Sequence, residues 1–308
     1  MRQSKAKERV LLLGAGGMLG AAVFETVSAR RSAVLATDID VNEPWLSHLD
    51  VRDISALAKA YDAFKPTVVF NLAALTDLED CERNPEAAWG TNALGAENAA
   101  LLAERCGATF VQVSTAGIFG GRQETYTDFD IPEPASVYAK SKYHAELVVE
   151  RRLTRYFVFR AGWMMGGGPR KDKKFVNKIY RQIKSGAREL FVVADKLGTP
   201  TYTKDFASGM LRVMDSGWHG LYNQVGGGGG SRLDVAREFV RLLGLASSVK
   251  VTRVASDHFK REYFAPRPRS EQLVNLKLTL RKMNYMRDWR DALAEYSQVF
   301  AKDYHGKS

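Results

Sequence analysis

A tyrosine and a lysine four residues apart are the strongest candidates for chemistry in this sequence. They lie in the stretch Tyr138-Ala139-Lys140-Ser141-Lys142, and on a helix Tyr138 and Lys142 would share one face. A free phenol has a pKa of about 10, but a neighbouring ammonium group stabilises the phenolate and lowers that value. The pair could therefore exchange a proton with a carbonyl or an alcohol near neutral pH. Taken alone, this spacing is also common on ordinary surface helices.

A hydroxyl group would complete this acid–base pair. The run Phe110-Val111-Gln112-Val113-Ser114-Thr115 predicts a buried strand that ends at Thr115. Thr115 could donate a hydrogen bond to a substrate oxygen while Tyr138 gives or takes the proton. Because a threonine at a strand end is more often a turn residue, this prediction depends on the other members of the set.

A glycine-rich turn near the start of the chain indicates the cofactor for such chemistry. An apolar run over 10–13 leads into Gly14 and Gly17, and a helical pattern begins at Met18. The glycines leave room for a diphosphate against the amides of the helix N-terminus, where the helix dipole favours negative charge. Asp38 ends the next apolar run, where a carboxylate could bind the ribose of a dinucleotide.

Strands and helices alternate along the first half of the chain, and this alternation positions the residues above. Strands are expected over 33–37, 67–70, 109–113 and 156–160, and helices over 54–64, 85–106 and 137–151. The pattern predicts an α/β fold with a doubly wound parallel Rossmann sheet. We expect a dinucleotide-binding domain over 1–160, joined by a segment near 203–226. A smaller C-terminal α/β lobe over 161–308 would bind the substrate.

A run of glycines over 226–230 allows two interpretations. It is either a flexible loop or a place where two backbones approach closely. Ser231 follows the run and would cap a helix over 232–243.

Composition narrows the classes of function. The chain has 308 residues, of which 45% are hydrophobic, enough for a large α/β domain with an appended lobe. Cys81 and Cys106 have no metal-like or redox-like spacing, so we expect reduced thiols in the cytoplasm and no metal. No signal peptide or membrane span is expected. The net charge of +10 comes without a nucleic-acid motif, and it favours an anionic small-molecule partner over nucleic acid.

Together these motifs resemble the extended short-chain dehydrogenase/reductases, whose pattern is a Gly-x-x-Gly-x-x-Gly loop with Tyr-x-x-x-Lys. Gly14, Gly17, Gly20, Tyr138 and Lys142 match that pattern. Within the family, the sequence is most similar to the dTDP-4-dehydrorhamnose reductases, over roughly residues 9–298. The segments that carry this similarity are 71–76 with Asp80 and Glu82, 114–121, Arg160-Ala161-Gly162-Trp163, 198–201 with Asp205, and 267–270.

The resemblance implies roles for individual residues. Thr115, Tyr138 and Lys142 would be catalytic, and Thr115 and Trp163 would contact a nucleotide sugar. A core position for Trp163 agrees with the sequence nearly as well. The residues implied to bind NAD(H) or NADP(H) are Gly14, Gly17, Met18, Leu19, Asp38, Asp50, Val51, Ala73, Ala74, Leu75, Tyr138 and Lys142.

The implied cofactor preference is slightly toward NAD(H). A carboxylate at Asp38 repels the 2′-phosphate of NADP(H). Arg30 and Arg31 precede the second strand and could reach round to that phosphate.

The implied activity is NAD(P)H-dependent reduction of a nucleotide-activated 4-keto-6-deoxy sugar. The family reductases usually have Asp-Tyr after the catalytic threonine, whereas this chain has Ala116 and Gly117. This departure leaves the exact sugar open and argues against a 4,6-dehydratase, which needs an acidic pair there. Two alternatives stay open: a nucleotide-sugar 4-epimerase with tightly bound NAD, and a regulatory subunit like the β subunit of methionine adenosyltransferase. The oligomeric state is open too, with a homodimer as one option.

Overall fold

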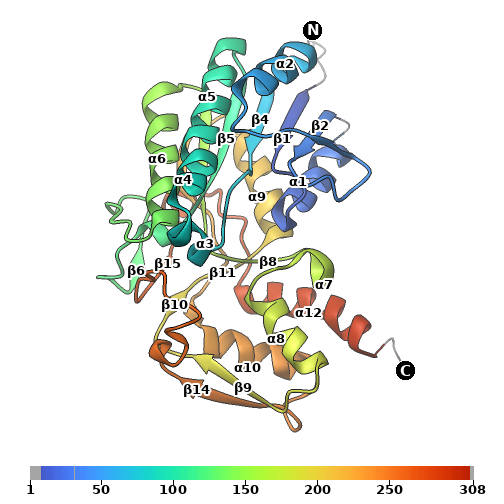
Figure 1. Ribbon diagram of the computed structural model, residues 1–308, viewed down its shortest axis with the longest axis vertical. Coiled ribbons are helices and arrows are strands. Elements are labelled where there is room, and N and C mark those ends of the chain that lie inside the picture. The colour runs from blue at the N-terminus through green and yellow to red at the C-terminus, as the bar shows by residue number, and fades with distance from the viewer. Residues whose placement is uncertain (1–7, 31, 306–308) are drawn as a thin grey trace. The chain divides into compact units, whose positions relative to one another are not determined.

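The computed structural model describes residues 8–30 and 32–305, which form two compact units (Figure 1). Unit 1 contains the described residues up to Ser114, together with Val137–Phe159 and Val213–Leu221. Unit 2 contains Thr115–Ser136, Arg160–Arg212 and the described residues from Tyr222 onward. The sequence predicted one division, at residue 160. In the structure the chain also passes from unit 1 to unit 2 after Ser114 and returns to unit 1 at Val137.

Unit 1 is built on a seven-stranded sheet with the order β12-β7-β5-β4-β1-β2-β3. The strands around β1 are parallel, with Val10 opposite both Val34 and Val68. Leu11 and Leu12 are fully buried although they point to opposite faces, as expected where helices cover both sides of a sheet. The predicted doubly wound Rossmann sheet is confirmed. Its strands are β1 (Arg9–Leu13), β2 (Ala33–Asp38), β3 (Leu46–His48), β4 (Val68–Asn71), β5 (Thr109–Thr115), β7 (Tyr156–Ala161) and β12 (Gly220–Asn223).

The helices of unit 1 follow the strands in chain order. Figure 1 shows α5 and α6 side by side, and the two helices pack against each other. The core joins Leu13 and Phe110 of the strands to Leu57 of α2 and Ala103 of α5. The helices are α1 (Met18–Ala29), α2 (Ile54–Phe64), α3 (Leu78–Arg83), α4 (Pro85–Ala88), α5 (Gly95–Cys106) and α6 (Val137–Arg152). The sequence pattern had not indicated β3 or α3.

The single helix predicted over 85–106 is wrong in its middle. Asn84 caps the start as expected, its side-chain oxygen accepting from the Ala87 amide at 3.3 Å. A π-helical segment, η1 (Trp89–Leu94), then separates α4 from α5. The wider turn carries Asn92, whose buried side chain is bonded to other parts of unit 1. Such π segments often lie at functional sites.

Unit 2 has a hydrophobic core of its own. Its largest buried side chains include Tyr180, Phe239, Trp289 and Phe300. Figure 1 shows α10 (Arg232–Leu242) beside the parallel pair β9 (Glu189–Val193) and β14 (Lys250–Val254). The other helices are α7 (Gly168–Lys171), α8 (Phe175–Lys184), α9 (Thr203–Asp215, which continues into unit 1), α11 (Leu276–Leu280) and α12 (Trp289–His305), with 3-10 turns η2 (Ala116–Ile118) and η3 (Ser256–Phe259).

Three further strand pairs join distant parts of unit 2. They are β6 (Thr125–Tyr126) with β15 (Gln272–Leu273), β8 (Trp163–Met165) with β11 (Pro200–Tyr202), and β10 (Leu197–Gly198) with β13 (Gly230–Ser231). The glycine run lies among them. A side chain on Gly226 would overlap the Pro200 carbonyl, so close backbone approach is the correct interpretation there. Ser231 caps α10 in a reciprocal box with Asp234, as its position predicted.

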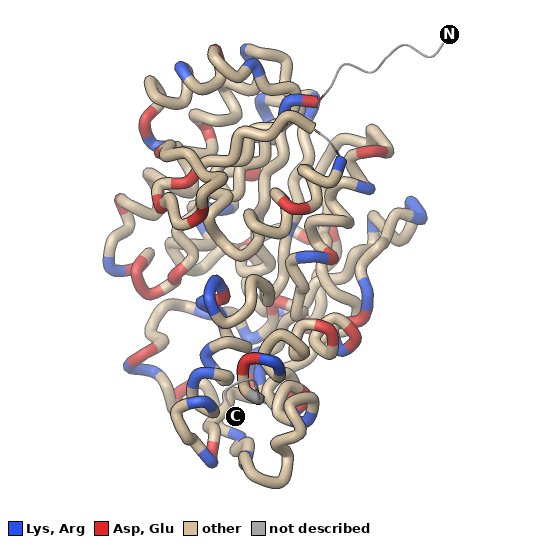
Figure 2. The backbone as a smooth tube through the Cα atoms, turned by 90° about the vertical axis from the view of Figure 1, so that its right-hand side faces the viewer, with Lys and Arg blue, Asp and Glu red and all other residues tan. Residues whose placement is uncertain are grey.

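Charge is distributed along the whole described chain. In Figure 2 the basic and acidic residues are interspersed along the tube. Within the described part of the chain, no helix has the length and apolar character needed to span a bilayer.

Candidate active site

Lys142 is buried inside unit 1. Its side chain is on α6, one turn after Tyr138, and its Nζ donates a 2.6 Å hydrogen bond to the Val113 carbonyl of β5. Burial lowers the pKa of Lys142 to about 8, and the charge of Glu146 partly opposes that shift. Lys142 is therefore still mainly an ammonium ion at neutral pH. Tyr138 is half-buried at the start of the same helix.

The helix that carries this pair is held at its N-terminus by two other residues. The Val137 amide donates to Glu82 Oε1 at 2.7 Å, which places a carboxylate at the positive end of the helix dipole. Asn92 Nδ2 donates to Ser141 Oγ at 3.1 Å, and Ser141 Oγ donates to the Tyr138 carbonyl at 2.9 Å. Glu82 and Asn92 are thus positioning residues for α6. Sequence reasoning missed Asn92, because an asparagine inside a helical pattern carries no signal of its own.

Asn92 also positions the segment after β4. Its Oδ1 accepts from the Leu75 amide at 2.8 Å, and its Nδ2 donates to the Leu75 carbonyl at 3.0 Å. At the other end of this segment, the backbone of Ala73 lies so close to Gly14 that any side chain there would overlap it. The structure therefore brings Ala73, Ala74 and Leu75 between the glycine turn and η1.

The glycine turn fits a bound diphosphate. Gly14 has a φ of 76°, which favours glycine. Gly17 precedes α1, whose first turn holds neither an acidic residue nor a side-chain cap among the described residues. A Cβ on Gly17 would meet no atom within 4 Å, so the amides of the first turn face open space. Met18 is half-buried and Leu19 is buried, so Leu19 could contact a cofactor only through its backbone.

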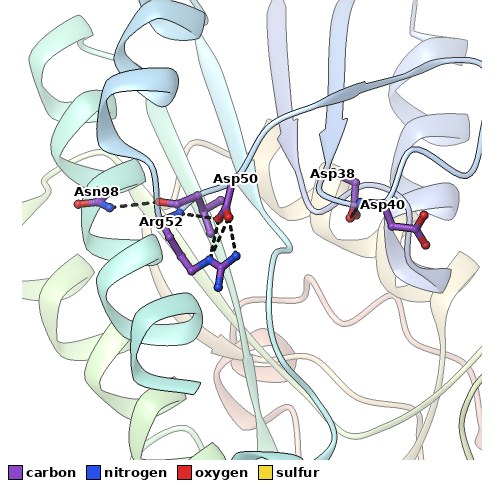
Figure 3. A network of polar contacts seen from close by, with 6 residues as sticks. Asp38, Asp40, Asp50, Arg52 and Asn98 are labelled. Atoms are coloured by element: carbon purple, nitrogen blue, oxygen red, sulfur yellow. Dashed lines mark hydrogen bonds and ion pairs between the residues drawn. The ribbon is translucent and has the colours of Figure 1, made fainter. Parts of the chain in front are cut away.

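Asp38 closes the glycine turn at the end of β2. Its Oδ2 accepts from the Gly16 amide at 2.8 Å, and its Oδ1 accepts from the Asp40 amide at 3.0 Å. Figure 3 shows Asp38 and Asp40 next to each other at this strand end. Arg30 forms an ion pair with Asp215 at 2.7 Å, and Arg31 lies outside the described residues. Asp38 is therefore a charged group that borders the turn through a direct hydrogen bond.

Asp50 and Val51 lie after β3. Arg52 forms a bidentate pair with Asp50, with a shortest distance of 2.6 Å, and this hydrogen bonding lowers the pKa of Asp50 despite partial burial (Figure 3). The Val51 carbonyl accepts from Asn98 at 3.1 Å. Its side chain is buried against Gly95 of α5. A cofactor contact by Val51 would therefore fall to its backbone.

Thr115 ends β5 and begins unit 2. Its Oγ1 accepts from the Gly117 amide at 3.2 Å, which forms the turn into η2. Two residues earlier on the same strand, the Val113 carbonyl holds Lys142. The half-buried Thr115 hydroxyl can still donate its own proton.

Trp163 is held in unit 2 by polar and cationic neighbours. Its Nε1 donates to Glu271 Oε2 at 3.0 Å, and the Arg232 guanidinium lies 3.7 Å from its ring centroid. Gly198 lies against the ring, and a side chain on Gly198 would overlap it. Trp163 is only half-buried, so the core interpretation does not describe it. Glu271 and Arg232 escaped the sequence analysis, although Glu271 directly follows the segment 267–270.

The remaining late motifs hold unit 2 together. Asp205 forms a bidentate ion pair with Arg287 at 2.8 and 3.0 Å. The Arg269 carbonyl accepts from the Leu197 amide at 2.9 Å, and Ser270 donates to the Glu124 carbonyl. In the described ranges, no group of three or more His, Cys, Asp or Glu residues could hold a metal ion.

The sequence and the fold of this chain are similar to those of known proteins. Residues 8–302 match the family described as the RmlD substrate binding domain. The chain is 31% identical to a dTDP-4-dehydrorhamnose reductase from Mycolicibacterium smegmatis, over 94% of this chain and 84% of that protein. The crystal structure of a dTDP-4-dehydrorhamnose reductase from Clostridium acetobutylicum has a TM-score of 0.86 and 34% identity, covering 94% and 98% of the two chains. Another, from Bacillus anthracis in complex with NADP, has a TM-score of 0.86 and 28% identity, covering 94% and 99%.

Proposed function

This chain belongs to the RmlD substrate binding domain family, and from that premise we propose that it is an NAD(P)H-dependent reductase of a nucleotide-activated 4-keto-6-deoxy sugar. The substrate class is that of the related dTDP-4-dehydrorhamnose reductases. The observation that supports this most strongly is the buried Lys142 ammonium on the same helix as Tyr138, within a unit that also carries an open glycine turn. A chain that only binds a partner has no need of a buried cation placed in this way.

Each residue of the proposed active site has one task. When bound, the nicotinamide supplies the hydride that the keto carbon receives. Tyr138 donates its proton to the oxygen of the former keto group, and the Lys142 ammonium stabilises the phenolate that remains. Thr115 donates a hydrogen bond that orients the keto oxygen, and Trp163 contacts the nucleotide sugar. The protein thus contributes positioning and a proton.

The cofactor would be held mainly by unit 1. The first-turn amides at Gly17 and Met18 would bind the diphosphate, and Ala73, Ala74 and Leu75 would lie along the path to the nicotinamide. Lys142 would also bind the nicotinamide ribose. Asp38 would bind the adenosine ribose and disfavour a 2′-phosphate, which favours NADH.

The decisive assay follows oxidation of NADH and of NADPH with freshly made dTDP-4-keto-6-deoxyglucose, with and without a 3,5-epimerase. We expect oxidation that depends on the sugar. Absence of oxidation, together with NAD that stays bound through purification, would instead identify an epimerase. A stoichiometric partner enzyme without any turnover would identify a regulatory subunit.

We also propose a cytoplasmic homodimer. Among the described residues, the buried Cys81 and the exposed Cys106 are not joined in a disulfide, which suits a reducing compartment. The η1 segment of unit 1 exposes Trp89 and Leu94, with 38% and 56% of their surface accessible, and such side chains could be covered by a second copy. Cell fractionation and light scattering on the purified protein test these two points separately.

A further inference from the structure

Two side-chain oxygens, from Thr115 and Glu271, flank Gly117 in unit 2. A Cβ placed on Gly117 would be 3.5 Å from Thr115 Oγ1 and 3.9 Å from Glu271 Oε1, both ordinary contact distances. Because residue 117 is a glycine, no side chain of its own fills this position. Thr115 Oγ1 and Glu271 Oε1 therefore flank the same point, and a ligand that lies beside Gly117 could reach both oxygens.

The carboxylate of Glu271 is held in a fixed orientation. Its Oε2 accepts from Trp163 Nε1 at 3.0 Å, and its backbone amide donates to the Leu197 carbonyl at 2.8 Å. Gly198 allows the indole ring to lie where it does, because a side chain at that position would overlap the ring. In the part of the chain that the structure describes, Oε1 has no hydrogen-bond partner. One oxygen of Glu271 therefore anchors the group, and the other is available to a ligand.

The surroundings of Glu271 act on its ionisation in opposite directions. Burial raises the pKa of Glu271 above its ordinary value, and the charge of Arg232, the bond from Trp163 and the charges of Arg267 and Lys196 offset only part of that shift. Lys196 is itself fixed by a 2.9 Å bond from its Nζ to the Arg267 carbonyl. In its ionised form, this carboxylate accepts hydrogen bonds and does not donate them.

We infer that Glu271 is a specificity-determining residue that accepts a hydrogen bond from the sugar hydroxyl on carbon 3, next to the keto carbon. The inference rests on the proposed function, in which Thr115 binds the keto oxygen. The hydroxyl on carbon 3 is the substrate hydroxyl nearest to that oxygen. Since Thr115 Oγ1 and Glu271 Oε1 flank the same point beside Gly117, the two residues can bind these neighbouring substrate groups together.

The test compares Glu271→Gln with the wild-type protein on two substrates. Glutamine keeps the shape and an oxygen for Trp163 but loses the charge of the acceptor. We expect kcat/KM for the full 4-keto substrate to fall about 10- to 100-fold, mainly through KM, which is the range for a charge-assisted hydrogen bond. On the 3-deoxy analogue, the two proteins should agree within about twofold. Glu262→Gln, a matched change at an exposed glutamate of the same unit, should leave both values unchanged.

The outcomes separate this inference from the proposed function. If the wild-type protein reduces no 4-keto sugar, the proposed function fails and the inference fails with it. If the wild-type protein is active and Glu271→Gln is equally active, only the inference is overturned. An equal loss on both substrates would overturn it as well, since it would show a structural role.

A second variant tests the space beside Gly117 independently. Gly117→Ala adds a methyl group at a point where it meets no atom closer than 3.5 Å, so the protein should fold with an unchanged melting temperature. We expect its KM for the full substrate to rise about tenfold, because the methyl group narrows the space between Thr115 and Glu271 in which the substrate would bind. An unchanged KM would contradict the inference.

Discussion

The two units position their functional residues in different ways. In unit 1 the glycine turn, the segment after β4 and the end of β2 all follow neighbouring parallel strands of one sheet. In unit 2 the residues around Trp163 come from short pairs such as β8–β11 and β10–β13, which join segments far apart in the chain. The first arrangement suits a cofactor common to many enzymes. In the second arrangement, substitution of a few side chains can alter which substrate is bound while the sheet stays intact.

The charged residues of the two units also have different surroundings. In unit 1, the charge of Glu146 raises the pKa of the buried Lys142 and so offsets part of the effect of burial. In unit 2, Glu271 lies among Arg232, Arg267 and Lys196. A single buried cation can stabilise a phenolate, whereas a cluster of mixed charge is suited to recognition of polar substrate groups.

The largest effect should come from Tyr138→Phe in unit 1. Removal of the phenol takes away the proton donor, so we expect turnover to fall by about 10²- to 10⁴-fold. Titration of NAD(P)H binding by fluorescence should give an affinity within about twofold of the wild type, since the aromatic ring stays in place. A variant as active as the wild type would refute the assignment of the proton donor.

Lys142→Met should also lower turnover, and it should change how the free energy of unfolding depends on pH. The pKa of Lys142 is lowered from 10.5 to about 8 in the folded protein. Between these values the unfolded chain binds a proton that the folded chain does not, so this group makes the wild type more stable as pH rises from about 8 to about 10. Urea unfolding at pH 7 and at pH 9.5 should show that gain in the wild type but not in the variant.

Lys140→Met provides the matched control, because Lys140 is exposed on the same helix. It should keep both turnover and the wild-type response to pH. If Lys142→Met shows the same response to pH as this control, Lys142 does not titrate in that range.

Two glycine substitutions test the roles of the two units separately. A side chain on Gly14 would overlap the Ala73 backbone in unit 1, and one on Gly198 would overlap the Trp163 ring in unit 2. We expect Gly14→Ala to weaken NAD(P)H binding by about tenfold and Gly198→Ala to raise the KM for the sugar by a similar factor. Each should leave the other ligand nearly unaffected, as measured by cofactor titration and by steady-state kinetics. Equal damage to both ligands in either variant would argue against this division of labour.

The smallest effect concerns the choice of cofactor in unit 1. Asp38→Asn removes a negative charge while one side-chain oxygen remains to accept from the backbone. We expect the ratio of kcat/KM for NADPH to that for NADH to rise about fivefold, or roughly 1 kcal/mol for one like charge near the surface. Steady-state kinetics with both cofactors measures this ratio, and an unchanged ratio would remove Asp38 from cofactor discrimination.

Local patterns in the sequence determined the framework of unit 1. An apolar run that meets glycines predicts a strand and a tight turn, and Tyr138 and Lys142 share a helix face whatever the rest of the chain does. The sheet and the alternation of strands and helices were predictable for the same reason. The π-helical segment at Trp89–Leu94 was not, because it changes the helical period without a sequence signal.

The long-range contacts were decided only by the tertiary structure. Asn92 joins Leu75 to Ser141, and Glu271 joins Trp163 to the position beside Thr115, across separations that no periodicity spans. The sequence by itself determined which chemistry this protein can perform, because acid–base groups and a glycine turn occur at local spacings. The tertiary structure decided which side chains lie beside Thr115, because a contact between residues far apart in the chain exists only once the backbone has brought them together.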